Sequence, residues 1–414
     1  MWVRKRIDIG GLDIATGLVR CALPADQGRV TERVARLWAH GDDVLVCLSV
    51  RTGFDLLLQA VRFPRGSHLL MSAINIGDMV RIVEHHGLVP VPVDVEPSTM
   101  APRVGAMARA ITPAARGLVV AHLFGGRVAM RPIAELARRH GLMVIEDCAQ
   151  AFDGGFRGHP EADVSMFSFG PIKTSTALGG AVIRVGDRQL LGRMRSLHQG
   201  YPSQTRVMYL RRLLKYVGIK GLSTRLTLRA VAQLFTLLKV DYDRVAGSAA
   251  RGFAGRDFFD RIRRQPSPVL LAVLERRLRR FDAFQLCLQQ RKAARLLELL
   301  GDHVACPGVA SQPHTFWVFP ILVDNPAELA GRLREAGFDA TRQHSLTVIP
   351  APAEGPAWEA KTASAIMERI VYLPLYPQMP DVEIERMAQI VTRAARRADR
   401  RCFESLAAGD VPRG

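Results

Sequence analysis

Short continuous apolar runs alternate with helical patterns between residues 44 and 185 of the chain. Strands that are apolar on both faces and separated by helices are typical of a mostly parallel sheet that helices cover on both sides. The pattern therefore predicts an α/β protein with a seven-stranded sheet. The predicted strands are VLVCL (44–48), HLLMS (68–72), VPVPVD (89–94), GLVVAH (117–122), LMVIE (142–146), VSMFSF (164–169) and GAVIRV (180–185).

The clearest helix between two of these strands covers residues 131–141. Its Ile133, Leu136 and Ala137 fall on one helical face, and Gly141 is a typical helix end. Ligands of such sheets bind beyond the carboxyl ends of the strands. The residues that directly follow each apolar run are therefore the first candidates for chemistry.

The second half of the chain predicts a smaller α+β domain. We expect a long helix at 267–301, a strand at 315–323, a helix at 327–337, a strand at 369–376 and a last helix at 382–397. The predicted organisation is a large α/β domain over 1–200, an insert over 201–255, and the long helix with the small C-terminal domain over 256–414.

The composition is that of a globular protein. Its 414 residues are 48% hydrophobic and 23% charged, which excludes wholesale disorder and collagen-like repeats. The six cysteines form no C-x-x-C pair, so we predict neither a metal site nor a disulfide framework. The basic N-terminus lacks a following apolar segment, and no uncharged apolar run reaches about 18 residues. We therefore expect a soluble, cytoplasmic protein.

The charge balance favours anionic partners, because 57 Lys and Arg against 39 Asp and Glu leave a net charge of +18. Residues 201–240 contain eight Lys or Arg and no Asp or Glu, with apolar residues at helical spacing. One interpretation is a solvated or oligomer-facing helical insert. The other is that Arg211, Arg212, Lys215 and Lys220 contact a membrane surface or a polyanionic substrate, which would make the protein peripheral at the inner membrane surface.

Three predicted strand ends carry side chains that one cofactor would use together. Residues 146–150 place carboxylates after one strand, residues 168–173 bring a lysine after the next, and residues 49–53 form a turn that opens an apolar helix. Pyridoxal 5'-phosphate needs an amine for its aldehyde and an anion beside its ring nitrogen. Its phosphate suits the free N–H groups of a helix N-terminus.

These segments resemble the core signature of the DegT/DnrJ-type sugar aminotransferases, which are pyridoxal-phosphate enzymes of fold type I. The resemblance rests on EDCAQ (146–150), FSFGPIK (167–173) and the following GG (179–180). It implies that Lys173 is the Schiff-base lysine and that Asp147 is the partner of the ring nitrogen. It further implies that Gln150 contacts the ring face or its 3-hydroxyl and that Ser168, Arg51 and Thr52 bind the phosphate.

The chain also departs from the family pattern. Where many members place an aromatic residue against the cofactor ring, Ile76 offers only an apolar face, and the N-Y-R-type segment after the lysine is not recognisable. His122 follows a strand near the expected cofactor, while His198 and His344 are candidates for a substrate cleft. For each of these three histidines, a purely structural role, with its hydrogen bonds made within the protein, also stays open.

The resemblance implies an aminotransferase that moves an amino group, with glutamate as donor, to a nucleotide-linked keto sugar. It also implies a homodimer in which one subunit completes the pocket of the other. Two alternatives stay open: a membrane-associated or regulatory protein of this fold without transaminase activity, and an aminotransferase for a lipid-linked or other non-sugar ketone. Nucleic-acid binding is disfavoured, because no recognition motif accompanies the positive charge.

Overall fold

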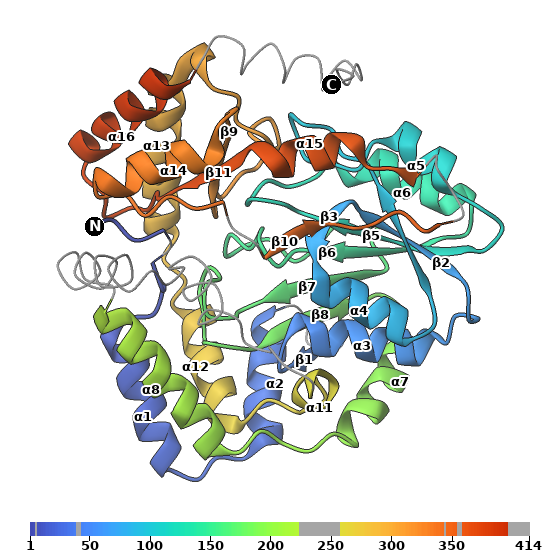
Figure 1. Cartoon of the computed structure of the whole chain (residues 1–414). Coiled ribbons are helices and arrows are strands. Elements are labelled where there is room, and N and C mark those ends of the chain that lie inside the picture. The colour runs from blue at the N-terminus through green and yellow to red at the C-terminus, as the bar shows by residue number, and fades with distance from the viewer. Residues whose placement is uncertain (5, 39–42, 223–256, 343–344, 354–357, 396–414) are drawn as a thin grey trace.

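The computed structural model describes residues 1–4, 6–38, 43–222, 257–342, 345–353 and 358–395 (Figure 1). Its centre is a seven-stranded sheet in the order β1-β8-β7-β6-β5-β2-β4, in which only β8 runs antiparallel to its neighbours. The strands are β1 (Val44–Cys47), β2 (His68–Ser72), β4 (Val89–Val93), β5 (Ala115–Ala121), β6 (Met143–Asp147), β7 (Val164–Ser168) and β8 (Ala181–Val185). The seven predicted strands and the mostly parallel sheet are confirmed.

Alternate strand residues fill cores on opposite faces of this sheet. Leu45 and Cys47 of β1 pack into one core, whereas Val44 and Val46 pack into the other. Because helices cover both faces, neither set of side chains meets water, which is why the strands are continuous apolar runs.

Three helices contribute to the first core: α3 (Val50–Val61), α4 (Gly77–His85) and α7 (Arg188–Gln199), together with the short α11 (Phe258–Ile262). The opposite face is covered by α2 (Gln27–Trp38), α5 (Val104–Ala110), α6 (Met130–Arg139) and α12 (Pro268–Arg279). Helix α1 (Gly11–Ala22) packs on α12, and α8 (Arg206–Leu222) packs on both of them.

A separate core forms around the two-stranded sheet of β9 (Phe319–Leu322) and β11 (Ile370–Leu373). It includes α13 (Ala283–Leu300), α14 (Pro326–Glu335) and α16 (Asp381–Ala394), and η1 (Gly301–His303) follows α13. Trp2 also packs in this core and pairs with Phe338, whereas Ile7 and Ile9 pack in a core of the large sheet. The predicted domain boundaries at 200 and 255 stay a prediction.

The long helix predicted at 267–301 is wrong, because the structure has α12 and α13 with a break between them. The side chain of Asp282 accepts a hydrogen bond from the backbone N–H of Gln285 and so starts a second helix. The sequence pattern also missed a short antiparallel pair, β3 (Ile74–Ile76) with β10 (Leu346–Val348), and α15 (Lys361–Arg369).

The predicted basic insert is described only as far as Leu222, so its part from 223 onward lies outside the described residues. Arg211 and Lys215 of α8 are exposed, but two of the four basic side chains proposed to reach a membrane point inward. Arg212 donates to the carbonyl oxygen of Leu178 at 3.2 Å, and the amino group of Lys220 donates to the carbonyl oxygen of Ile9. Among the described residues, no helix has both the length and the apolar character needed to cross a membrane.

Candidate active site

Asp147 ends β6 in the middle of the sheet, between β5 and β7. Its Oδ1 accepts a hydrogen bond of 3.0 Å from the backbone N–H of Ala149, and Oδ2 accepts none from the described residues. Burial raises the pKa of Asp147, while the Ala149 N–H and the charges of Lys173 and Arg51 counteract part of that rise. A buried carboxylate of this kind favours a cation beside it.

Lys173 lies in the turn after β7, where its backbone N–H donates to the carbonyl oxygen of Gly170. Its Nζ lies 4.1 Å from the centroid of the Trp317 indole ring, within range of a cation–π contact. The Trp317 Nε1–H donates to the carbonyl oxygen of Ile172 at 2.9 Å. One buried tryptophan therefore contacts both the lysine side chain and the backbone beside it.

Sequence reasoning missed Trp317, which comes from the segment before β9. That segment is bound to the loop after β5: the Thr315 N–H donates to the Gly125 carbonyl oxygen at 2.8 Å. The Phe124 N–H of the same loop donates to Oε1 of Gln150 at 2.9 Å. Gln150 and Trp317 thus meet the same loop, which links the candidate ring-contacting residue to the lysine turn.

Of the two predicted phosphate-binding residues at the start of α3, Thr52 is buried and Arg51 is partly exposed. The Thr52 hydroxyl is fully buried and donates to the carbonyl oxygen of Ile262 at 2.7 Å, while its backbone N–H donates to Oγ of the cap residue Ser49. Both donors of Thr52 therefore have partners within the protein, and its role at the phosphate stays a prediction. The first two amides of the helix, those of Val50 and Arg51, have no acceptor within a regular helix and could receive a phosphate.

Arg51 is partly exposed and contacts a carboxylate that the sequence reasoning did not include. Its Nε donates to Oδ2 of Asp78 at 2.5 Å, and Asp78 lies in the first turn of α4. Ser168 is also partly exposed at the end of β7, and its Oγ accepts a long hydrogen bond of 3.4 Å from the Gly170 N–H. Both side chains are accessible for an anion at the sheet edge.

Ile76 ends β3 and pairs with Leu346 of β10, with its side chain partly buried. The preceding residue, Asn75, is only 3% exposed, and its Nδ2 is buried with no hydrogen-bond partner among the described residues. An unpaired buried amide is costly, so Asn75 is a further candidate donor to a bound group. No sequence pattern had singled out this residue.

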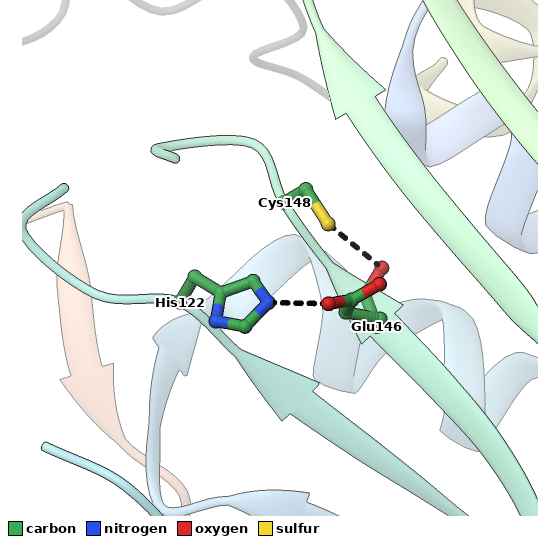
Figure 2. Close-up of side chains that lie close together, drawn as sticks. All are labelled: His122, Glu146 and Cys148. Carbon is green, nitrogen blue, oxygen red and sulfur yellow. Dashed lines mark hydrogen bonds and ion pairs between the residues drawn. The ribbon is translucent and has the colours of Figure 1, made fainter. Parts of the chain in front are cut away.

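His122, Glu146 and Cys148 lie close together at the ends of β5 and β6 (Figure 2). His122 Nδ1 accepts from the Val128 N–H, so the proton is on Nε2, which donates to Glu146 Oε1 at 2.7 Å. Burial raises the pKa of the Cys148 thiol well above its usual value, so the thiol stays protonated. His122 thus uses both ring nitrogens in hydrogen bonds within the protein, which favours a structural role.

His198, the second candidate histidine, lies inside the protein. It is buried in α7 beside Tyr201, and burial lowers its pKa to about 4. His344 lies outside the described residues.

A known enzyme family matches much of this sequence. The model of the DegT/DnrJ/EryC1/StrS aminotransferase family matches residues 30–239, just over half of the chain. The chain belongs to this aminotransferase family. Enzymes of the family depend on pyridoxal 5'-phosphate, so the expected family, enzyme class and cofactor are confirmed.

Two relatives are named for nucleotide-linked sugars or their products. The chain is 33% identical over 187 residues to a UDP-N-acetyl-3-dehydro-alpha-D-glucosamine 3-aminotransferase of Acidithiobacillus ferrooxidans, a match that covers 44% of this chain and 50% of that protein. It is 25% identical over 355 residues to the GDP-perosamine synthase of Caulobacter vibrioides, which covers 83% of each chain.

Solved structures of aminotransferases share the fold. TlmJ from Streptoalloteichus hindustanus superimposes with a TM-score of 0.70 at 19% identity, covering 95% of this aminotransferase and 98% of TlmJ. NtdA from Bacillus subtilis, solved with bound pyridoxamine phosphate, gives a TM-score of 0.67 at 18% identity, covering 94% and 83% of the two chains. The expected fold, a mostly parallel sheet between helices with a smaller C-terminal part, is thereby confirmed.

Pyridoxal 5'-phosphate fits the residues that the structure brings to this edge. Asp147 offers a buried carboxylate oxygen without a partner among the described residues, and Lys173 offers an amine held against an aromatic ring. The first turn of α3 offers amides to the phosphate.

Proposed function

We propose that this aminotransferase moves the amino group of glutamate onto a keto group of a nucleotide-linked sugar. The observation that carries the amino-transfer chemistry is the buried Asp147 at the end of the central strand β6, next to strand β7, which the Lys173 turn follows. The names of two relatives, which refer to UDP- and GDP-linked compounds, support the substrate class. The net charge of +18 favours such an anionic substrate.

Each residue has a distinct part in the proposed reaction. The Lys173 amine would hold the cofactor through its aldehyde and, when free, would take and return a proton at Nζ. Asp147 holds a positive charge at the ring nitrogen, because its buried carboxylate is stabilised by a nearby cation. Gln150 contacts the ring, and Ser168, Arg51 and the first amides of α3 hold the phosphate.

When bound, pyridoxal 5'-phosphate supplies an electron sink for the bond broken at the amino-bearing carbon. The protein's contribution is to position that carbon against the Lys173 amine and to exclude water from Asp147. Trp317 fixes the Lys173 turn through its two contacts.

The experiment incubates the holoenzyme with glutamate and, separately, UDP-, GDP- and dTDP-linked keto sugars, and follows 2-oxoglutarate and the amino sugar by chromatography. We expect one nucleotide class to react with glutamate. Transamination of non-nucleotide ketones alone would replace the substrate proposal with the non-sugar alternative. Stable cofactor binding without turnover of any ketone or donor would favour the regulatory alternative.

We further propose that the enzyme is a homodimer, since its family resemblance implies that a second subunit completes each pocket. Sedimentation of the active holoenzyme should give twice the mass of one chain. A fully active monomer would refute this proposal.

We also propose a cytoplasmic location with peripheral contact at the inner membrane surface. Cys21, Cys47, Cys148, Cys287 and Cys306 are free thiols, and thiols persist in reducing compartments. The basic α8 supports the contact with the membrane, and fractionation of cells would test both parts of the proposal.

A further inference from the structure

Helix α1 exposes apolar side chains along one face. Leu12 is 70% exposed, Val19 57% and Leu18 42%. Leu12 and Val19 are two turns apart on the same side of the helix, and Leu18 flanks them. The opposite face is buried: Gly17 lies so close to α8 that a Cβ there would be 3.0 Å from Leu213. The apolar residues therefore point away from the protein.

Helix α8 repeats this arrangement beside α1, at the edge of the molecule (Figure 1). Tyr209, Leu213 and Tyr216 form its buried face, whereas Val207, Leu214 and Leu222 are each more than half exposed. Because α1 and α8 contact each other and both pack on α12, their outer faces form one continuous surface. We call this the α1–α8 surface.

The charges on this surface have one sign. Arg211 and Lys215 are exposed on the outer face of α8, and Arg20 is exposed in the last turn of α1. The one carboxylate of the two helices, Asp13, is buried and bound by Arg276 and Arg277. Exposed basic groups beside exposed apolar groups need a partner that is anionic and apolar at once.

A second copy of the chain would not meet both needs. In a two-fold contact, this surface would face itself and bring Arg20, Arg211 and Lys215 against the same cations without a carboxylate between them. A lipid bilayer with anionic headgroups accepts basic side chains at its surface and apolar side chains just below it.

We infer that the α1–α8 surface is the part of the molecule that binds an anionic membrane. The inference rests on the peripheral location proposed above and names its contact surface. It also changes the expected set of contacts, because Arg212 and Lys220 face inward and α1 contributes exposed apolar side chains of its own.

The same helix supports the lysine turn from its inner side. The Tyr209 hydroxyl donates to the Ala177 carbonyl oxygen at 3.0 Å, and Arg212 donates to that of Leu178, between Lys173 and β8. Variants for a test must therefore come from the outer face. Val19, Arg211, Leu214 and Lys215 meet that requirement, since all four are exposed.

The test is flotation of the holoenzyme with vesicles of phosphatidylcholine alone or of equal parts phosphatidylcholine and phosphatidylglycerol. The wild type should float only with the anionic vesicles, and less as salt rises, because exposed charges are screened within about 10 Å at 0.1 M. R211Q/K215Q should lower the partition coefficient about 25-fold, or about fivefold per charge. V19N/L214N should lower it about tenfold per residue.

Two matched controls lie elsewhere on the molecule. V382N changes a 68% exposed residue of α16, and R139Q changes an exposed arginine at the end of α6. Both should float as the wild type does. Equal losses in the controls, or wild-type flotation of the surface variants, would overturn the inference.

Two further measurements distinguish membrane binding from self-association and from the transamination itself. If V19N/L214N dissociates a larger oligomer without lipid, the surface is a contact between copies and the membrane inference fails. Transamination is measured without vesicles, so an active enzyme that does not float refutes only the membrane contact. A floating protein without transaminase activity refutes only the proposed reaction.

Discussion

Glu146 offers the clearest link between one side chain and the stability of the sheet edge. It is fully buried, and its Oε1 accepts from His122 Nε2 at 2.7 Å. Its Oε2 accepts from the His159 N–H at 2.8 Å and from the Ser165 hydroxyl at 2.7 Å. Every neighbour is a donor, so E146Q would turn one amide N–H group toward another donor.

The magnitude follows from the ionisation of Glu146. Burial opposes its charge, but the hydrogen bonds from His122, His159 and Ser165 outweigh burial and lower its pKa from 4.5 to about 2. At 1.36 kcal/mol per pKa unit, this corresponds to roughly 3 kcal/mol of stability. Because the pKa is lowered in the folded state, that stability is present above pH 4.5 and disappears as the pH falls toward 2.

Urea unfolding of the enzyme, followed by circular dichroism, measures this contribution. We expect E146Q to lower the free energy of unfolding by about 3 kcal/mol at pH 7 and by clearly less at about pH 3, where wild-type stability has begun to fall. E135Q is the control, since Glu135 is half-exposed and pairs with Arg131 on α6, and it should change stability by less than about 1 kcal/mol. An E146Q effect below about 1 kcal/mol, or one that does not depend on pH, would refute the reasoning.

Substitutions at two other positions test the candidate site. D147N should keep some cofactor but lose most transaminase activity, because a neutral amide cannot stabilise a cation at the ring nitrogen. Since burial raises the pKa of Asp147, thermal unfolding of the cofactor-free protein should show no loss of stability in this variant. Wild-type turnover by D147N would remove Asp147 from the mechanism. W317L should slow formation of the visible cofactor adduct about tenfold, because it removes a cation–π contact. The rate for W317F should lie between those of W317L and the wild type, because phenylalanine keeps a ring but not the N–H donor to Ile172. Equal rates in the wild type, W317L and W317F would show that Trp317 has no role at Lys173.

The strands were predictable because both faces of the sheet are buried and each strand is a continuous apolar run. The break between α12 and α13 was not, because the apolar pattern continues through it and the cap depends on the side-chain geometry of Asp282. Helix α8 shows a similar limit. Its basic residues were visible in the sequence, but the packing on α12 and on the lysine turn decides that Arg212 faces inward while Arg211 is exposed.

The candidate site was predictable where its residues follow strands in one short stretch, as Asp147 and Lys173 do. Trp317 was not, because it approaches Ile172 from 145 residues further along the chain. The inward turn of the Thr52 hydroxyl depends likewise on the carbonyl group of Ile262 at the end of α11, which only the folded chain brings to α3.

The central claim is that Lys173 carries the cofactor. Borohydride reduction of the holoenzyme, followed by peptide mapping, tests it most directly. We expect a phosphopyridoxyl group on the peptide that contains Lys173, and addition of glutamate before reduction should prevent its attachment. K173A should keep the circular dichroism spectrum of the wild type and show no modified peptide. A modified lysine elsewhere in the wild type, or an adduct on the K173A protein, would contradict the account.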